Sequence, residues 1–357
     1  MSKSDIDPIY YTIVKILIRE INMSILVNHQ QYSQAIKNSI ISLIMGDMMG
    51  TPVQFILRKN LQKSLKDEPI SSLILKTKSN IPFGSWSDDS SMTLCTMESI
   101  AEKSNIDLKN LVEYFCKWLY KGYMTPFNKT FDVGMTTMEG LNRYIRTDKT
   151  VMDIVAPNGS TNIRSNGNGS LMRILPVSIY CYFRKLSSKE TFKIIDNVSS
   201  LTHAHAISVL GCYIYTLIVF DILDGKSKNE IIENLKNIYN NEAIPDEYRV
   251  WLDEYSEIIN GNIIKENAEN IDSSGYVKST LGVAIWGFYN NKSVEDCIFR
   301  IIELGHDSDT NGAVGAGLSG LYYGLRGNLA QDYWVNKIIK KDMINTVIEK
   351  YIEILNV

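Results

Sequence analysis

Charge of one sign, clustered cysteines and long uninterrupted apolar runs are all scarce in this 357-residue sequence. With 37 basic and 40 acidic residues the net charge is −3, so the chain lacks the basic excess that sequence-independent nucleic-acid binding requires. Nucleic acid is therefore unsupported as a broad electrostatic partner, although it stays open as a substrate.

The cysteines are too dispersed for a zinc site or a disulfide framework. No two of them have C-x-x-C spacing, and each falls in an apolar segment, which is typical of reduced core residues in an intracellular compartment. We therefore expect an intracellular, cytoplasmic protein. The five are Cys95, Cys116, Cys181, Cys212 and Cys297.

A segment near the N-terminus has the length of a membrane anchor but not its composition. Ile9 to Val27 is interrupted by Lys15, Arg19 and Glu20, and no small-residue cleavage site follows. We interpret residues 1–30 as an N-terminal helical extension that holds an amphipathic helix, and we expect no membrane partner.

Apolar residues recur at helical spacing through the remaining chain, whereas strand signals are scarce. After Ser33, a residue suited to an N-cap, the helical pattern continues to Gly46. Because no repeat or linker divides the chain, residues 31–357 are expected to form an all-α, single-domain compact helical bundle. Further helices are expected at Leu108–Tyr120, Lys189–Ser200, Ala206–Leu223, Ser279–Tyr289, Val294–Leu304 and Tyr333–Leu355.

Three segments fall outside these helices. Lys121–Thr137 and Asp153–Ser170 are expected to be long polar loops, and loops of that length often carry binding functions. Asn229–Asp272 is rich in Asn, Glu and Ile, and we interpret it as a charged surface insertion between core helices.

Small residues repeat every fourth position in a helix expected from about Thr310. They are Gly312, Ala316, Gly320 and Gly324. Because a glycine in a helix costs up to ~1 kcal/mol relative to alanine, this stripe predicts a compensating close contact with another backbone.

Two acidic clusters stand just before apolar helices. Asp88 and Asp89 follow Ser87, and Asp307 and Asp309 precede Thr310. Each cluster alone is more often a helix cap than a metal site.

Together, the two clusters favour a metal site. If they meet at one point in the fold, four carboxylates repel one another unless cations neutralise them. The oxygen-rich ligand set suits magnesium, calcium or manganese, and four charges suggest two divalent ions.

A series of motifs in chain order resembles the ADP-ribosylglycohydrolases, the family of the dinitrogenase-reductase-activating glycohydrolase and the ADP-ribosyl-acceptor hydrolases. The resemblance covers about residues 33–325. Its motifs are Gly46-Asp47-Met48-Met49-Gly50, Trp86-Ser87-Asp88-Asp89-Ser90-Ser91-Met92, Asp132-Val133-Gly134-Met135-Thr136-Thr137, Ser165-Asn166-Gly167-Asn168-Gly169-Ser170-Leu171-Met172-Arg173, Thr202-His203-Ala204-His205, Gly275-Tyr276-Val277 and His306-Asp307-Ser308-Asp309-Thr310.

The resemblance implies a dinuclear centre of two Mg²⁺ or Mn²⁺ ions at the base of an ADP-ribose cleft. The implied metal ligands are Ser87, Asp88, Asp89, Asp307, Asp309 and Thr310. Contacts to the diphosphate and the distal ribose are implied for Gly134, Met135, Ser165, Asn166, Gly167, Asn168 and Gly169, and His203 is implied to lie near the ribose hydroxyls.

The glycine-rich loop and the histidines also have simpler interpretations. Asn166-Gly167-Asn168-Gly169 could free backbone N–H groups for phosphate oxygens, but alone it is a tight turn. His203 and His205 lack a third nitrogen ligand, so they are poor evidence for zinc.

The implied activity is a metal-dependent hydrolase that removes ADP-ribose from an acceptor, with water attacking the anomeric carbon. Asp88 or Asp89 would activate the water. The substrate would be ADP-ribose or an ADP-ribosylated protein or small molecule. Arginine, serine, poly-ADP-ribose, acetyl-ADP-ribose and nucleotide-base linkages all stay open.

Gln54 departs from the family pattern, which usually has a glutamate there. Glutamine can offer a carbonyl oxygen to a metal, but it cannot accept a proton. Gln54 is therefore a candidate site residue. It leaves open the alternative that the protein is a catalytically impaired ADP-ribose-binding module. A third possibility is a structural helical protein whose acidic pairs only cap helices.

Overall fold

The fold is given by a computed structural model that describes residues 30–76, 81–146, 161–325 and 332–356. Within these ranges the regular secondary structure is helical, and strand pairing is limited to an isolated bridge between Gly167 and Tyr276. The prediction of an all-α fold is confirmed. The helix expected within Ile9–Val27 lies outside the described residues.

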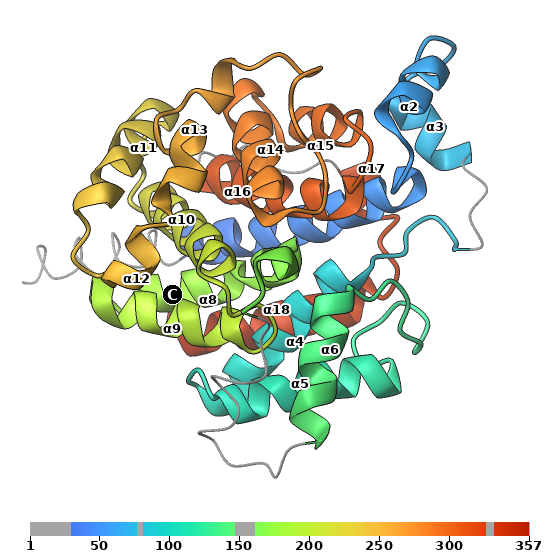
Figure 1. Ribbon diagram of the computed structural model, residues 1–357. Coiled ribbons are helices and arrows are strands. Elements are labelled where there is room, and N and C mark those ends of the chain that lie inside the picture. The colour runs from blue at the N-terminus through green and yellow to red at the C-terminus, as the bar shows by residue number, and fades with distance from the viewer. Residues whose placement is uncertain (1–29, 77–80, 147–160, 326–331, 357) are drawn as a thin grey trace, which may run out of the picture.

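The bundle is built from helices of two length classes (Figure 1). A helix over residues 30–50 comes first. The longer helices that follow are α4 (Asp88–Lys103), α5 (Leu108–Lys121), α6 (Met135–Arg146), α8 (Leu175–Phe183), α9 (Ser188–Ser200), α10 (Ala206–Leu223), α11 (Lys228–Leu235), α14 (Val277–Asn290), α15 (Val294–Ile302), α16 (Ser308–Leu325) and α18 (Lys341–Leu355).

Shorter helices connect them. The short α-helices are α2 (Arg58–Ser64), α3 (Ile70–Lys76), α12 (Asp246–Arg249), α13 (Ser256–Ile259) and α17 (Asp332–Val335). The 3₁₀ turns are η1 (Thr51–Val53), η2 (Ile163–Ser165), η3 (Asn168–Arg173), η4 (Lys236–Asn240), η5 (Leu252–Tyr255) and η6 (Ile263–Lys265).

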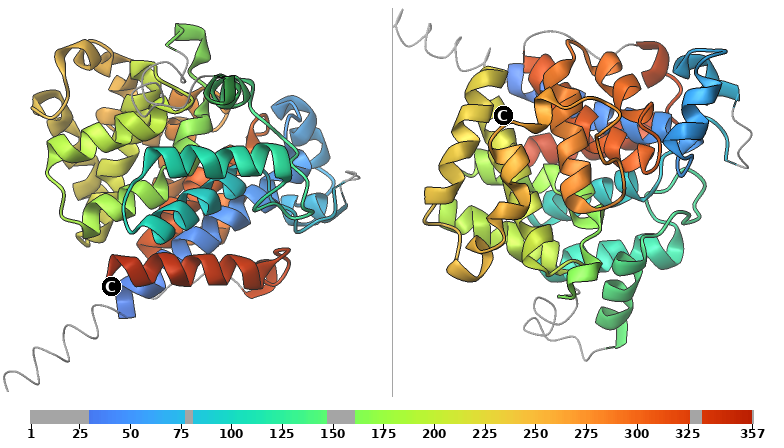
Figure 2. Two further views of the ribbon diagram at one scale, coloured as in Figure 1. Left: turned by 90° about the horizontal axis from the view of Figure 1, so that it is seen from below. Right: turned by 45° about the horizontal axis from the view of Figure 1, so that its top comes forward.

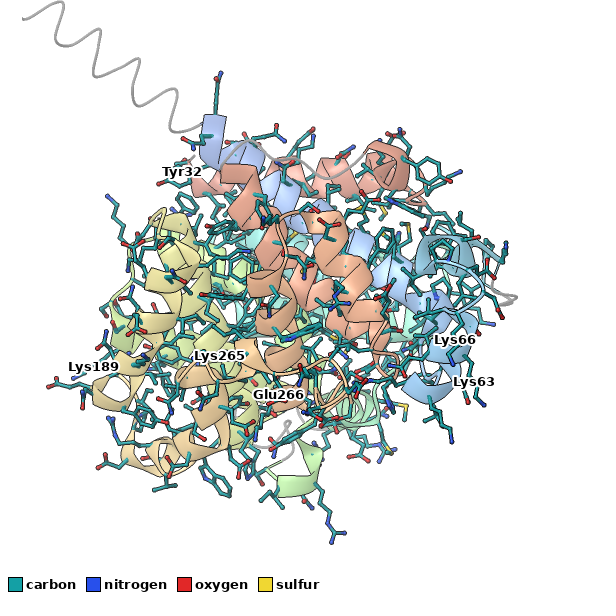
Figure 3. All side chains as sticks on the ribbon, turned by 90° about the horizontal axis from the view of Figure 1, so that it is seen from above. Tyr32, Lys63, Lys66, Lys189, Lys265 and Glu266 are labelled. Carbon is teal, nitrogen blue, oxygen red and sulfur yellow. The ribbon has the colours of Figure 1, made fainter. Side chains whose placement is uncertain are left out.

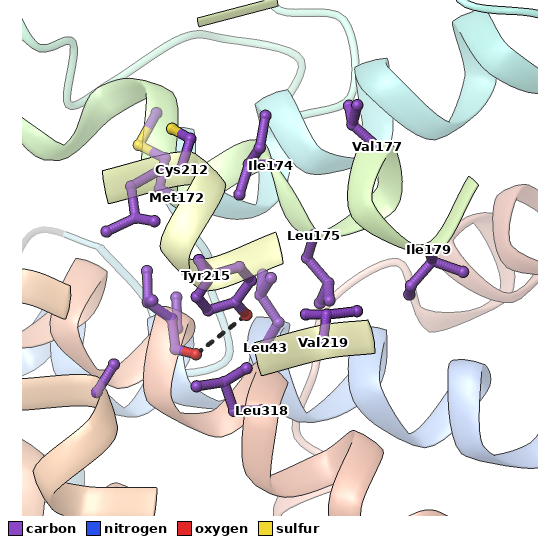
Figure 4. Close-up of a cluster of buried hydrophobic side chains, with 14 of the residues drawn as sticks. Leu43, Met172, Ile174, Leu175, Val177, Ile179, Cys212, Tyr215, Val219 and Leu318 are labelled. Carbon is purple, nitrogen blue, oxygen red and sulfur yellow. Dashed lines mark hydrogen bonds between the residues drawn. The ribbon is translucent and has the colours of Figure 1, made fainter. Parts of the chain in front are cut away.

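Helices α10 and α16 form the centre of the bundle. α10 is long and apolar enough to cross a membrane, but 83% of its apolar window is buried inside the protein, as expected of a core helix. It packs against α8, α9, α14 and α16. Figure 4 shows Leu43, Leu175 and Leu318 meeting beside Tyr215, whose hydroxyl donates to the Val314 carbonyl at 3.3 Å.

The small-residue stripe of α16 lies against the helix of residues 30–50. A Cβ atom added at Gly46 would lie 2.3 Å from the Gly312 carbonyl oxygen, and one added at Gly50 would lie 2.4 Å from the Ser308 carbonyl oxygen. One added at Gly320 would lie 2.6 Å from the hydroxyl of Ser42. The predicted close backbone contact is therefore confirmed, and it places the N-terminus of α16 beside the end of the first helix.

Helix α4 lies between α5 and α18, as Figure 2 shows. Most of its residues are buried, including both acids of its first turn. Lys63, Lys66 and Lys189, which Figure 3 labels, lie at the edge of the molecule in that view and are exposed.

The prediction that Asn229–Asp272 is a charged surface insertion is wrong. Its isoleucines recur at helical spacing and are buried, for example Ile231 and Ile258, while Asn and Glu face outward. The hydroxyl of Tyr255 donates to the carbonyl of Ile207 in α10 at 2.6 Å. The segment is polar on average, so its composition alone did not reveal this apolar face.

The prediction of a single terminal helix at Tyr333–Leu355 is also wrong, because the helical structure is interrupted between α17 and α18. The Ile339 N–H donates to the Gly84 carbonyl at 3.0 Å, outside any helix. Lys340 then adopts a left-handed conformation, with φ 56°. These local backbone demands are not visible in the apolar periodicity.

Candidate functional site

The first acidic cluster forms the N-terminus of α4. The Ser87 hydroxyl donates to Asp89 Oδ2 at 2.8 Å and caps the helix by accepting from the Asp89 N–H. Ser87 is 1% exposed, Asp88 8% and Asp89 0%. The positive end of the helix dipole favours both carboxylates at this position.

Asp47, from the helix of residues 30–50, braces this corner. Its carboxylate accepts hydrogen bonds from the Ser87 N–H at 2.9 Å and from the Ser90 N–H at 3.0 Å and hydroxyl at 2.5 Å. In the sequence, Asp47 stands in one of the family motifs without an assigned role. A lone carboxylate among methionines in an apolar helix was the available signal.

The second acidic cluster meets the first at the N-terminus of α16. The Thr310 hydroxyl lies 3.4 Å from Asp89 Oδ2 and 3.5 Å from Asp307 Oδ1. Thr310 and Asp89 are 221 residues apart in the sequence. Asn168 donates to Asp307 Oδ2 at 2.6 Å, which joins the glycine-rich loop to the same corner. The structure thus brings both clusters to one point.

Three carboxylates at this point offer the ligand set of a cation. One oxygen each of Asp47, Asp89 and Asp309 lies within 4.8 Å of the others. Asp89 Oδ1 and Asp309 Oδ2 are buried and accept no hydrogen bond from the described residues. Such unpartnered hard oxygens fit a divalent ion. The oxygens of Asp47 are already hydrogen-bonded, so Asp89 and Asp309 are the better-placed ligands.

Burial and mutual repulsion disfavour the charged forms of the clustered carboxylates. Burial, reinforced by neighbouring carboxylates, raises the pKa of Asp88, Asp89 and Asp309 well above its usual value. Burial raises the pKa of Asp47 to about 6, against the opposing effect of its hydrogen bonds to Ser90 and Ser87.

A cavity of about 420 Å³ opens above the acids. Its size suits a small ligand. Of the residues singled out in the sequence, those that line it are Gln54, Asp88, Gly134, Met135, Gly167, Asn168, Gly169, His203, Asp307 and Thr310. Ser87, Asp89 and Asp309 lie beneath them and do not line it.

Ser165 and Asn166 do not line the cavity. The Asn166 side chain is buried and braces the loop, because it donates to the Ile163 carbonyl at 2.9 Å and accepts from the Ser208 hydroxyl at 2.8 Å. His205 is the N-cap of α10, and its Nδ1 accepts from the N–H of the second residue of that helix.

Comparisons with known proteins identify the family. The family model described as ADP-ribosylglycohydrolase matches residues 28–356. The chain belongs to this family. It is thus a hydrolase of the class that acts on ADP-ribose glycosyl bonds.

Individual relatives are distant. The chain is 27% identical over 315 residues to "ADP-ribosylarginine hydrolase Tri1" of Serratia proteamaculans, covering 88% of this chain and 78% of the relative. It is 23% identical over 289 residues to the "ADP-ribosyl-[dinitrogen reductase] glycohydrolase" of Rhodospirillum rubrum, covering 80% and 85%. A solved "ADP-ribosylglycohydrolase-related protein complex" has the same fold, with a TM-score of 0.68, 21% identity and coverage of 92% of this chain and 99% of that one.

Gln54, the departure from the family pattern, lies at the cavity wall and faces Asp132. Its side-chain amide donates to Asp132 Oδ2 at 2.6 Å. The neighbouring Phe55 is 71% exposed. Asp132 stood in a quoted motif without an assigned role, and its place in the cavity depends on a loop conformation that spacing does not encode.

Proposed function

We propose that this family member removes ADP-ribose from an arginine acceptor. The observation that supports this most directly is the meeting of two buried acidic clusters beneath a ligand-sized cavity. Two relatives, from Serratia proteamaculans and Pseudomonas putida, are named ADP-ribosylarginine hydrolases. Among the described residues that line the cavity are Asp88, Asp132 and Asp307 but no Lys or Arg, which favours a cationic guanidinium group.

The proposed metal site consists of Asp89 and Asp309, which have unpartnered oxygens, together with Ser87, Asp88, Asp307 and Thr310. Two Mg²⁺ or Mn²⁺ ions held there would supply Lewis-acid chemistry and orient ribose hydroxyls and water. Asp47 would keep the first turn of α4 in position through its hydrogen bonds to Ser87 and Ser90.

Asp88 is the proposed proton acceptor. Unlike Asp89 it lines the cavity, where the attacking water would be bound. Water oxygen bonds to the anomeric carbon while the bond from that carbon to the acceptor nitrogen breaks. One water proton passes to Asp88, which then donates it to the departing nitrogen, so that arginine leaves as its guanidinium.

The decisive experiment is release of ADP-ribose from ADP-ribosylated arginine in magnesium, in manganese and in chelator. Asp88→Ala and Asp307→Ala are expected to abolish turnover. Asp246→Ala is the matched control, because its side chain is 102% exposed. Turnover that persists in both site variants, or in excess chelator, contradicts the proposal.

A second candidate function is an ADP-ribose-binding module without turnover. The observation behind it is that Gln54 holds Asp132 and cannot accept a proton. Tight ADP-ribose binding without release from any conjugate would support this candidate. Measurable turnover by the unaltered protein would eliminate it.

A further inference from the structure

Within the part of the chain that the structure describes, a buried arginine beside the cavity makes no hydrogen bond or ion pair with a carboxylate. Arg173 ends η3 and is 0% exposed. Its guanidinium lies 4.5 Å from the ring centroid of Phe115 and donates to Met92 Sδ at 3.6 Å. Its strongest hydrogen bond goes to the hydroxyl of Thr202, at 2.7 Å.

Thr202 links this cation to the active-site histidine. Its Oγ1 lies 2.8 Å from His203 Nδ1, and these two contacts are the hydrogen bonds of this hydroxyl within the described residues. Arginine can only donate, so Thr202 accepts from Arg173. The single hydroxyl proton is then free to be donated to Nδ1, and any other arrangement leaves it buried and unused.

A proton donated to Nδ1 determines the tautomer of the ring. A neutral imidazole that accepts at Nδ1 carries its own proton on Nε2. That edge of the ring faces the glycine-rich loop, because a Cβ atom added at Gly169 would lie 3.3 Å from Nε2 and one added at Gly167 would lie 3.7 Å from it. Both glycines and His203 line the cavity.

We propose that Arg173 and Thr202 are positioning residues that hold His203 in the Nε2–H tautomer, so that the ring presents a fixed hydrogen-bond donor to the cavity. Resting on the proposed function, the acceptor would be an oxygen of the ADP-ribose. The ring does not act as an acid or a base. Burial and the nearby Arg173 charge lower the pKa of His203 to about 3, which agrees with a neutral ring.

The arrangement gives the cavity a donor among acids. Asp88, Asp132 and Asp307 offer hydrogen-bond acceptors, which repel phosphate oxygens, whereas a neutral N–H can donate to a phosphate or ribose oxygen. A histidine that alternated between tautomers would offer this donor only part of the time. The buried cation behind Thr202 removes that alternation.

Ring-nitrogen NMR of the ligand-free, full-length protein tests the tautomer directly. Histidine labelled with ¹⁵N in the ring gives long-range ¹H–¹⁵N correlations that show which nitrogen carries the proton. The chain has four histidines, and a His203→Gln variant assigns the signal. The expected result is a proton on Nε2 alone. A proton on Nδ1, or on both nitrogens at neutral pH, overturns the proposal.

Two variants of Thr202 test the role of its hydroxyl. Thr202→Val is expected to give a mixture of tautomers and about tenfold weaker ADP-ribose binding by calorimetry, the size of one buried hydrogen bond. Thr202→Ser keeps the hydroxyl and is expected to retain the Nε2–H form. A folded Thr202→Val protein with an unchanged tautomer overturns the proposal. If Thr202→Val does not fold, the wild-type spectrum still decides.

The measurement separates the two proposals. The ring spectrum is recorded without substrate, so a failure to hydrolyse any ADP-ribose conjugate leaves it unaffected. Conversely, a hydrolase whose His203 carries its proton on Nδ1 keeps the proposed function and loses this inference.

Discussion

The acid cluster of Asp47, Asp89 and Asp309 and the buried cation of Arg173 are satisfied in opposite ways. One oxygen of each acid lies within 4.8 Å of the others, and Asp89 and Asp309 each keep an unpartnered oxygen. Arg173 is surrounded by a hydroxyl, a thioether and an aromatic face, which solvate a cation without cancelling its charge. The acids therefore leave oxygens open to a ligand from outside, whereas side chains of the fold surround the cation, of which only Nε makes no hydrogen bond within the described residues.

The largest expected effect comes from removing one acid of the cluster. Asp309→Asn is expected to lower kcat/KM by more than ~100-fold, since outer-shell partners of a metal already contribute ~10- to 100-fold. It should also abolish the rise in Tm on adding magnesium. Mass action puts the stabilising free energy behind that rise at about 2.7 kcal/mol for a ligand at 100 times its Kd.

Asp246→Asn is the control for that experiment, because it removes a fully exposed carboxylate. A normal magnesium response in Asp309→Asn would show that this acid is not a ligand. Activity and thermal scans with and without chelator provide both readouts.

The second prediction concerns pH. A carboxylate whose pKa is raised on folding stabilises the protein at low pH, and this contribution is lost as the pH rises through the folded value. With the pKa of Asp47 raised from 3.8 to about 6, the metal-free protein is expected to lose on the order of 2–3 kcal/mol between pH 4 and 7.

Magnesium should oppose that trend, because a cation bound to the neighbouring Asp89 and Asp309 displaces protons from the cluster and favours its ionised form. Denaturant unfolding at several pH values, in chelator and in magnesium, measures both slopes. A metal-free stability that rises from pH 4 to 7 would show that folding does not raise the pKa of Asp47.

The positions of the acids could largely be predicted from the sequence, whereas the surroundings of the buried arginine could not. Ser87 through Asp89 and Asp307 through Thr310 stand before apolar helices, so their types and spacing predicted where the acids lie. Asp47 and Asp132 were quoted and given no role, since their positions depend on a helix crossing and on a loop.

Arg173 was less accessible to sequence reasoning. An arginine beside methionine and leucine usually extends to solvent, and nothing local shows that Thr202 and Phe115 lie around it. The all-α fold was predictable because apolar periodicity is local. The break before α18 was not, because a backbone contact with Gly84 determines it.

The third prediction concerns the replacement of the buried Arg173 by a neutral residue. Arg173→Met keeps an apolar stem in the same space and leaves no buried charge behind, so it should cost about 1–3 kcal/mol of unfolding free energy from the lost hydrogen bond and cation–π contact. The magnesium response is expected to stay intact. If that response is lost as well, the two regions are not independent.

The smallest effect is expected at Gln54, where a neutral amide meets an acid. Gln54→Glu would set a second carboxylate about 2.6 Å from Asp132 in place of a donor, so the pair must separate or share a proton. Turnover is expected to fall less than tenfold, because the loop is partly solvated and can relax. The double variant Gln54→Glu/Asp132→Asn restores one donor and one acceptor with their positions exchanged, and it should recover the loss if the hydrogen bond is what matters. If the unaltered protein is inactive and the single Gln54→Glu variant gains turnover, the opposite conclusion follows. The missing base at position 54, and not the hydrogen bond to Asp132, would then be what limits activity.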